Sequence, residues 1–269
     1  MKRQNRGIRR ALPVLLLTVL CMLLGGCMLK SPETLYALPK QSESYYNLQE
    51  AVDAVVSGSV RYCAPVNGEN RQPVQLKDLN GDGKNEAIVF AQTDTEKPLR
   101  IFVFEQTKEK YELAATIEGS GNSFDSVQYA QVDGTPGVEI VVGRSISDQV
   151  LKSVSVYTFQ QGSTIELLSA NYSNFRIIDL DNDGRQDLFL VRFDADLQTG
   201  TAELYRYSDG MMVRDPELML SGSAGAVRRM TTGMMDENVP AVFVASVLDD
   251  NQVVTDVFAI RDGVMQNVA

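Results

Sequence analysis

The chain contains no histidine and no tryptophan, and only three of its 269 residues are cysteine. The absence of histidine excludes Ser-His-Asp and Cys-His catalysis, together with zinc or iron sites that use histidine ligands. The absence of tryptophan removes the aromatic side chain best suited to stacking on a sugar ring. Chemistry based on a pair of carboxylates stays open, because the chain has 35 acidic residues.

The few cysteines also limit cross-linking. Cys21 lies in an N-terminal apolar segment, Cys27 follows that segment, and Cys63 stands alone in the remainder of the chain. No intramolecular disulfide is therefore expected once the N-terminal segment is removed. Without a histidine base, Cys63 is better explained as a small packing residue than as a nucleophile.

The N-terminus has the three parts of a secretory signal. Residues 1–10 carry five basic side chains and no acidic one, residues 11–24 form an apolar segment, and Gly25-Gly26-Cys27 follows. The apolar segment is shorter than the roughly 20 residues that a membrane-spanning helix needs. The sequence Leu24-Gly25-Gly26-Cys27 at the end of this segment resembles a bacterial lipobox, which implies cleavage before Cys27 and lipidation of its sulfur. We therefore expect an exported protein, anchored by lipid to the outer face of the bacterial cytoplasmic membrane.

Charge narrows the range of partners. Removing residues 1–26 takes away five basic residues and no acidic ones, so the formal net charge moves from −10 to −15. A surface this acidic repels nucleic acid and anionic lipid headgroups and favours cations and solubility. We expect no nucleic-acid partner, and we expect a monomer.

Two short segments, DLNGDGKNE at 78–86 and DLDNDGRQD at 179–187, place oxygen-bearing side chains at positions one, three, five and nine around a glycine at position six. Calcium takes six to eight oxygen ligands, so side chains, one backbone carbonyl and water would complete each site. The predicted calcium ligands of the first loop are Asp78, Asn80, Asp82 and Glu86, with the carbonyl of Lys84. Those of the second loop are Asp179, Asp181, Asp183 and Asp187, with the carbonyl of Arg185.

Two other interpretations compete with calcium hairpins. An EF-hand loop ends in a bidentate glutamate at position twelve and continues into a helix, but position twelve here is Val89 or Leu190. Ordinary acidic turns would explain a single Asp-Gly pair through local hydrogen bonds. They do not explain the same four offsets repeated 101 residues apart, because acids placed so close repel one another unless a cation lies among them.

The strand that follows each loop belongs to a repeat. Related apolar segments begin at Glu86, Glu139, Asp187 and Pro240, at steps of 53, 48 and 53 residues. Each step contains four short strand-like segments. The second segment of the first step is expected at Glu86–Gln92, and the last segment of the third step near Glu217–Leu220. Four short strands per step are typical of propeller blades and less so of an up-and-down barrel. The predicted fold is all-β, a propeller-like array of four four-stranded blades. Whether four blades form a tight ring or an open arc stays undecided at this point.

The motif D-x-[DN]-x-D-G-x-x-[DE] before an apolar strand, repeated about every fifty residues, resembles the FG-GAP/VCBS repeat of integrin-type β-propellers and bacterial surface proteins. The resemblance covers 71–269 and implies calcium loops on a propeller scaffold. The second repeat, QVDGTPGVE, keeps only Asp133 and Glu139 of the motif, and the fourth, from Thr232, keeps almost nothing. Calcium is therefore predicted for two loops only.

The predicted organisation has four parts: a lipoprotein signal peptide at 1–26, a lipid-anchored linker at 27–44, a short amphipathic helix at 45–58, and the repeats at 59–269. For the helix, Ser44 is the expected N-cap and Gly58 the expected stop. The function expected from the sequence is a non-catalytic, calcium-binding surface module that binds a protein or a glycan. The alternative is a carboxylate-dependent hydrolase or lyase acting on the cell envelope or on polysaccharide.

Replacing Cys27 with serine should abolish lipid attachment, because the serine hydroxyl cannot take the place of the thiol that carries the lipid. An acyl anchor is what makes retention at a membrane stable. In cell fractionation, Cys27→Ser should therefore leave the protein unprocessed or released. Processing and membrane retention equal to those of the natural chain would contradict the lipoprotein prediction.

Overall fold

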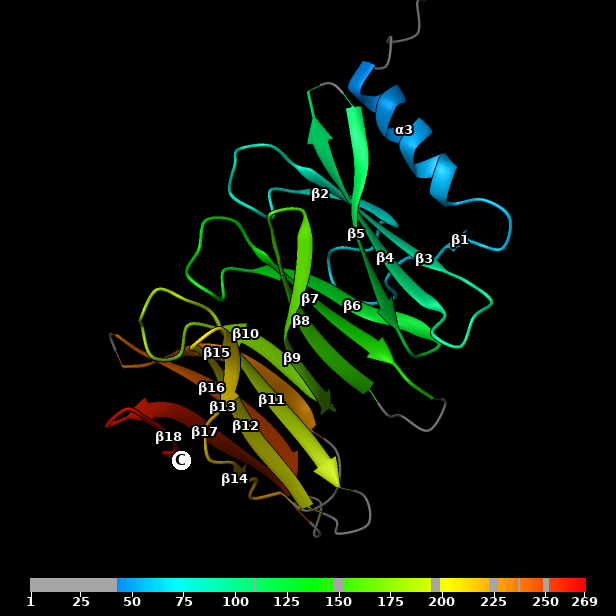
Figure 1. Ribbon diagram of the computed structural model, residues 1–269. Coiled ribbons are helices and arrows are strands. Elements are labelled where there is room, and N and C mark those ends of the chain that lie inside the picture. Colours follow the sequence, from blue (N-terminus) through cyan, green and yellow to red (C-terminus); the bar gives the residue numbers. More distant parts are fainter. Residues whose placement is uncertain are drawn as a thin grey trace, which may run out of the picture. The chain divides into compact units, whose positions relative to one another are not determined.

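The computed structural model describes residues 43–108, 110–147, 152–194, 199–222, 227–236, 238–248 and 252–269. The signal segment and Cys27 lie outside these residues. The described part, Glu43 to Ala269, forms one compact unit. It contains one helix, α3 (Glu43–Val55), and strands in four antiparallel sheets (Figure 1).

The four sheets follow one another in chain order, so each is built from consecutive strands. The first contains β1 (Arg61–Tyr62), β2 (Val74–Lys77), β3 (Glu86–Gln92), β4 (Leu99–Thr107) and β5 (Lys110–Gly119). The second contains β6 (Ser123–Ala130), β7 (Glu139–Ser145), β8 (Lys152–Gln160) and β9 (Ser163–Tyr172). The third contains β10 (Asn174–Ile178), β11 (Asp187–Asp194), β12 (Thr199–Ser208), β13 (Met211–Arg214) and β14 (Leu218–Met219). The fourth contains β15 (Val227–Asp236), β16 (Val239–Val247), β17 (Val253–Arg261) and β18 (Val264–Asn267). This arrangement confirms the predicted all-β, propeller-like fold of four blades.

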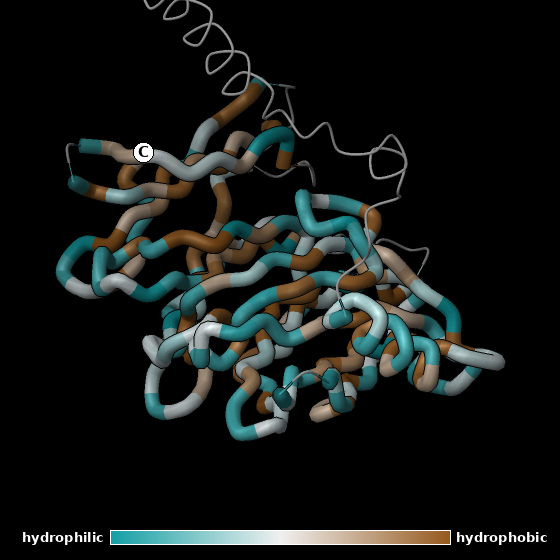
Figure 2. Tube along the Cα trace, turned by 90° about the horizontal axis from the view of Figure 1, so that it is seen from above, coloured by the Kyte–Doolittle hydropathy of each residue, from teal (hydrophilic) through white to brown (hydrophobic). Residues whose placement is uncertain are grey.

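Apolar side chains on both faces of the inner strands hold successive sheets together. In β3, Ile88 and Phe90 point toward the second sheet, where they share a buried cluster with Ile140 and Val142 of β7. A second cluster joins the second and third sheets, and a third cluster joins the third and fourth. Figure 2 shows hydrophobic residues along the strands and hydrophilic residues at many of the loops that connect them. Each sheet therefore depends on its neighbour to remove apolar surface from water.

The other face of the first sheet is covered by helix α3. Val52 of the helix is only 2% exposed and packs against Ala87, Val89 and Phe102 of the first sheet. In a closed ring of blades, this face would contact the fourth sheet. Among the described residues, the buried cluster on this face consists of the helix and the first sheet alone, together with the segments that join them.

Some local predictions differ from the structure. The helix begins at Glu43, so Ser44 lies in its first turn and does not precede it. The last strand of the third sheet was expected near 217–220, but the fourth strand in order is β13, whose Met212 pairs with Tyr207 of β12. The expected segment is β14, which pairs with the other end of β12. The two segments pair with different parts of the same ten-residue strand, which a repeat pattern of four strands does not reveal.

Val52→Ala should lower the free energy of unfolding by about 2 kcal/mol, because it leaves a cavity between α3 and the first sheet. The matched control is Glu50→Ala on the exposed side of the same helix, which should change stability by less than about 0.5 kcal/mol. Denaturant titration of the two variants measures the difference. Equal effects would show that the helix does not seal this face.

Candidate metal centre

Both acidic segments are hairpin loops that end at the first residue of an inner strand. The first joins β2 to β3 and the second joins β10 to β11, so Glu86 and Asp187 at position nine begin their strands. The turn glycines, Gly83 and Gly184, have φ angles of +83° and +87°. Residues that carry a side chain rarely adopt this backbone conformation, so the turn itself requires glycine at position six.

The two loops share three hydrogen bonds at the same offsets. The position-one carboxylate accepts from the N–H of position six, the position-five carboxylate accepts from position seven, and the position-nine carboxylate accepts from position two. In the first loop these are Gly83 to Asp78 (3.0 Å), Lys84 to Asp82 (2.8 Å) and Leu79 to Glu86 (2.7 Å). In the second they are Gly184 to Asp179 (3.0 Å), Arg185 to Asp183 (2.8 Å) and Leu180 to Asp187 (3.0 Å). This shared set of hydrogen bonds gives the two hairpins the same local backbone shape.

The second loop brings Asp179, Asp181 and Asp187 together. One carboxylate oxygen from each lies within 4.8 Å of the others, a grouping that could hold a metal ion. Asp187 is only 4% exposed. Burial, followed by the neighbouring charges of Asp181, Asp183 and Asp179, raises the pKa of Asp187 to about 7. A cation among these oxygens would remove the repulsion and favour the ionised form.

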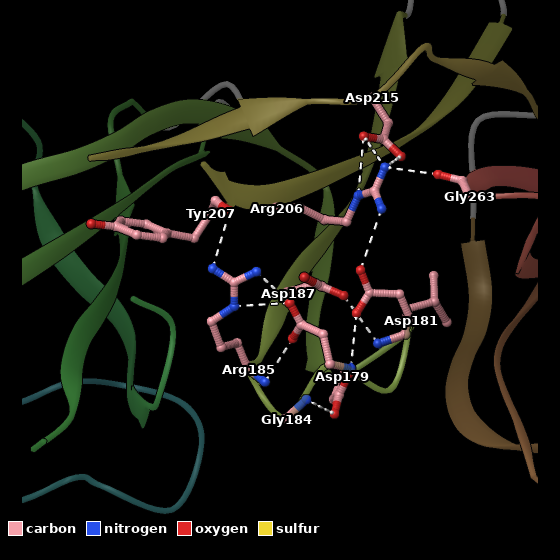
Figure 3. Close-up of polar contacts among 11 residues, drawn as sticks. Asp179, Asp181, Gly184, Arg185, Asp187, Arg206, Tyr207, Asp215 and Gly263 are labelled. Atoms are coloured by element: carbon pink, nitrogen blue, oxygen red, sulfur yellow. Dashed lines mark hydrogen bonds and ion pairs between the residues drawn. The ribbon is translucent and has the colours of Figure 1, made fainter. Parts of the chain in front are cut away.

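The fourth predicted side chain, Asp183, is directed elsewhere. Its carboxylate forms an ion pair with Arg185, whose guanidinium lies over the ring of Tyr207, 5.9 Å from the ring centre. Figure 3 shows Arg185 next to the backbone carbonyl of Tyr207. Hydrogen bonds from Arg185 hold the pKa of Asp183 below its usual value. Three of the four predicted acids of this loop therefore converge, and the fourth is neutralised by the residue at position seven.

Arg206, which the sequence pattern did not single out, joins the cluster from β12. Its guanidinium lies 3.3 Å from the carboxylate of Asp181 and 2.8 Å from that of Asp215, and it donates to the carbonyl of Gly263 (3.1 Å) (Figure 3). The arginine lies 25 residues from Asp181 in sequence, so no local spacing reveals the contact. It reduces the negative charge around Asp181 and ties the loop to the fourth sheet.

In the first loop, Glu86 is the most buried acid, at 1% exposed. Its Oε2 accepts from Leu79, but its Oε1 is buried without a hydrogen-bond partner among the described residues. Burial raises the pKa of Glu86, and the charges of Asp82 and Asp78 add to the effect. Within the described chain, the acids of this loop do not converge as those of the second loop do. The unpartnered oxygen nevertheless fits a cation ligand.

The two remaining loops show which part of the pattern belongs to the fold. In the second sheet, Glu139 at position nine still accepts from the N–H of Val132 (2.6 Å), although Asp133 hydrogen-bonds to Thr158. The acid at position nine thus anchors the hairpin even where the other ligands are lost. In the fourth sheet the acid is absent, and β15 and β16 continue to the end of the hairpin.

The loops of successive sheets contact one another. Gly81 of the first loop lies so close to the β6–β7 hairpin of the second sheet that an added Cβ would overlap Pro136. The N–H of Gln186 in the third sheet donates to the carbonyl of Gln131 in the second (2.7 Å). Asn182 donates to the carbonyl of Asn238 in the fourth (3.0 Å). The candidate metal loops therefore lie within a chain of contacts that links all four sheets.

Among the other predicted sites, Cys27 lies outside the described residues. Cys63 is a free thiol packed against the cluster between the first two sheets, and burial raises its pKa. No helix within the described residues is long and apolar enough to cross a membrane.

Comparison with known proteins identifies no family. No family model and no curated protein matches the chain. Among solved structures, a rhamnogalacturonan lyase is similar with a TM-score of 0.43 and 14% identity, over 78% of this chain and 50% of that chain. The chain thus spans half the length of that enzyme's chain. A likeness of this size carries no argument about activity.

The stability of the calcium-free protein should depend on pH through Asp187. Its pKa is about 7 in the folded chain, against about 3.9 for an unfolded aspartate. Between these values the folded state binds the proton more tightly, so stability falls as pH rises from about 4 to about 7. Asp187→Asn keeps the acceptor for Leu180 and should flatten this slope. Melting temperatures at several pH values in calcium-free buffer test this, and parallel curves for the two proteins would contradict it.

Proposed function

We propose that the chain is an exported, lipid-anchored, calcium-binding module of the FG-GAP/VCBS type, which binds a protein or a glycan at the cell surface without catalysis. The observation that carries the calcium assignment is the convergence of Asp179, Asp181 and Asp187. The lipid anchor rests on Cys27, and the surface location follows from it.

Calcium is the cation that suits these donors best. All the predicted ligands are carboxylate, amide or backbone carbonyl oxygens, which hard cations prefer. The 12-residue loop of an EF-hand is not needed, because the hairpin supplies ligands from both of its sides. Magnesium demands a stricter octahedral geometry and keeps more of its water, so a site built mainly from protein oxygens fits calcium better.

A structural role for the cation follows from where the loops lie. Each loop fixes the start of an inner strand and also contacts the loop of the next sheet. Withdrawing the cation would leave several acids facing one another at these contacts. Stability would then fall together with the packing of one sheet on the next.

Calcium should raise the melting temperature of the full-length chain, kept soluble in mild detergent. A ligand that binds only the folded state stabilises it by about 2.7 kcal/mol at a hundredfold excess over its Kd, which corresponds to several degrees. Asp179→Ala removes one of the three converging carboxylates and should therefore remove much of the calcium-induced shift, and Asp82→Ala in the first loop should remove part of it.

The matched control is Asp133→Ala in the hairpin between β6 and β7 of the second sheet, which has lost most of the predicted ligands. This variant loses hydrogen bonds to Thr158 and Gln160, so its melting temperature should fall by a similar amount with and without calcium. Its calcium-induced shift should equal that of the natural chain. Identical melting temperatures of the natural chain in chelator and in millimolar calcium would show that the two loops are ordinary acidic turns. Turnover of cell-wall or other polysaccharide would contradict the non-catalytic part of the proposal.

A further inference from the structure

A cleft of about 300 Å³ opens between the first and second sheets, apart from the acidic loops. It is formed by the loop before β4, the end of β5 and the strands β7, β8 and β9. The residues that line it include Lys97, Glu118, Gly119, Arg144, Tyr157 and Glu166. Its volume is at the lower end of the range for small-molecule sites, which starts at about 300 Å³.

Arg144 of β7 is the most unusual residue in this cleft. It is only 7% exposed, and its Nη2 donates to the hydroxyls of Ser155 and Tyr157. Its Nε is buried and has no hydrogen-bond partner among the described residues. No ion pair joins Arg144 to an acid within the described chain. Buried guanidinium groups are normally paired with a carboxylate, because burying an unpaired charge is costly.

The backbone of the first sheet makes room for this arginine. Gly119, at the end of β5, lies so close that an added Cβ would overlap Nη1 of Arg144 and contact its Cδ and Cζ at 3.2 and 3.3 Å. The φ of Gly119 is not in the left-handed region, so the turn does not require glycine here. The close approach of Arg144 is the physical reason for the missing side chain.

The neighbouring acids are already engaged. Glu118 forms an ion pair with Arg100 at 3.1 Å, and Glu166 accepts from the hydroxyl of Tyr157 at 3.3 Å. Lys97 adds a further positive charge at the mouth of the cleft. Lys97 and Arg144 equal Glu118 and Glu166 in number among the lining residues, and because Glu118 is paired with Arg100, the guanidinium of Arg144 is left to receive an anionic group.

We propose that this cleft binds the carboxylate of a small, hydroxyl-rich acid of the hexuronic type. The guanidinium of Arg144 would receive the carboxylate, a pairing that is charge-assisted and directional. Glu166 and Ser169 on β9 and Ser153 on β8 line the same cleft and offer acceptors and donors for ring hydroxyls. A dianionic phosphate is disfavoured, because Glu118 and Glu166 flank the site. The inference deepens the proposed function, since it names a ligand class for a module proposed to bind glycans.

Isothermal titration of the full-length chain in mild detergent tests the inference, with glucuronate and galacturonate compared with glucose, galactose and inorganic phosphate. The uronates should bind at least about tenfold more tightly than the neutral sugars, because a hydrogen bond to a charged group contributes more than one to a neutral group. Phosphate should bind more weakly than the uronates. Equal binding of uronates and neutral sugars, tighter binding of phosphate, or no binding at all would overturn the proposal.

Variants place the binding at Arg144. Arg144→Gln should weaken uronate binding about tenfold or more, and Gly119→Ala should weaken it as well, because it displaces the guanidinium. Arg229→Gln, on the exposed surface of the fourth sheet, is the matched control and should bind as the natural chain does. Thermal melts show which variants remain folded. If Arg144→Gln does not fold, the ligand comparison on the natural chain still decides the outcome. Unchanged binding in a folded Arg144→Gln variant would overturn the assignment.

The two proposals fail in different ways. A uronate preference without a calcium-induced rise in melting temperature would refute the calcium module and leave the carboxylate site standing. A calcium-induced rise without a uronate preference would refute only the carboxylate site.

Discussion

The constraint on which the structure depends is that the inner strands of its first three sheets are apolar on both faces. In β3, neighbouring residues such as Ile88 and Val89 face opposite sides and are both fully buried. A sheet of this kind cannot be stable alone, because one face would stay in contact with water. The order of the four sheets, and the helix that covers the first, follow from the need to cover each face in turn. Such a stack is held together by neighbour-to-neighbour contacts, as in repeat proteins.

The acidic loops take part in the same neighbour-to-neighbour coupling. Their acids at position nine anchor the hairpins through a backbone hydrogen bond, and this role survives at Glu139, where the other ligands are lost. The remaining acids concentrate negative charge at the points where one sheet meets the next. A bound cation would therefore act on the packing between sheets as well as on a single hairpin.

Much of the fold was predictable because its signals are local. The run at 86–92 is apolar throughout its centre and bounded by polar turns, and it forms β3 with the expected limits. The acidic loops could be located in the same way, since glycine at position six and the acids are fixed by turn geometry. What was not predictable depends on contacts between distant residues. Arg206 contacts Asp181, and Arg144 contacts Gly119. The two residues of each pair are 25 positions apart, and no sequence pattern marks them as neighbours. The fourth strand of the third sheet was misplaced for a different reason, since the Asp209-Gly210 turn between β12 and β13 is a local signal that the repeat pattern did not include.

Helix α3 buries the outer face of the first sheet, so the two ends of the stack differ in how well their outer faces are covered. The fourth sheet turns Phe243 and Val257, which are only half-buried, away from the third sheet. Within the described residues the fourth sheet packs against the third alone, and in a stack coupled only between neighbours local opening starts at such a sheet and proceeds inward. Backbone amides of the second and third sheets would then exchange with solvent most slowly and those of the fourth most rapidly. Amides of the first sheet would exchange nearly as slowly as those of the second and third sheets, because the 13-residue helix α3 covers its other face.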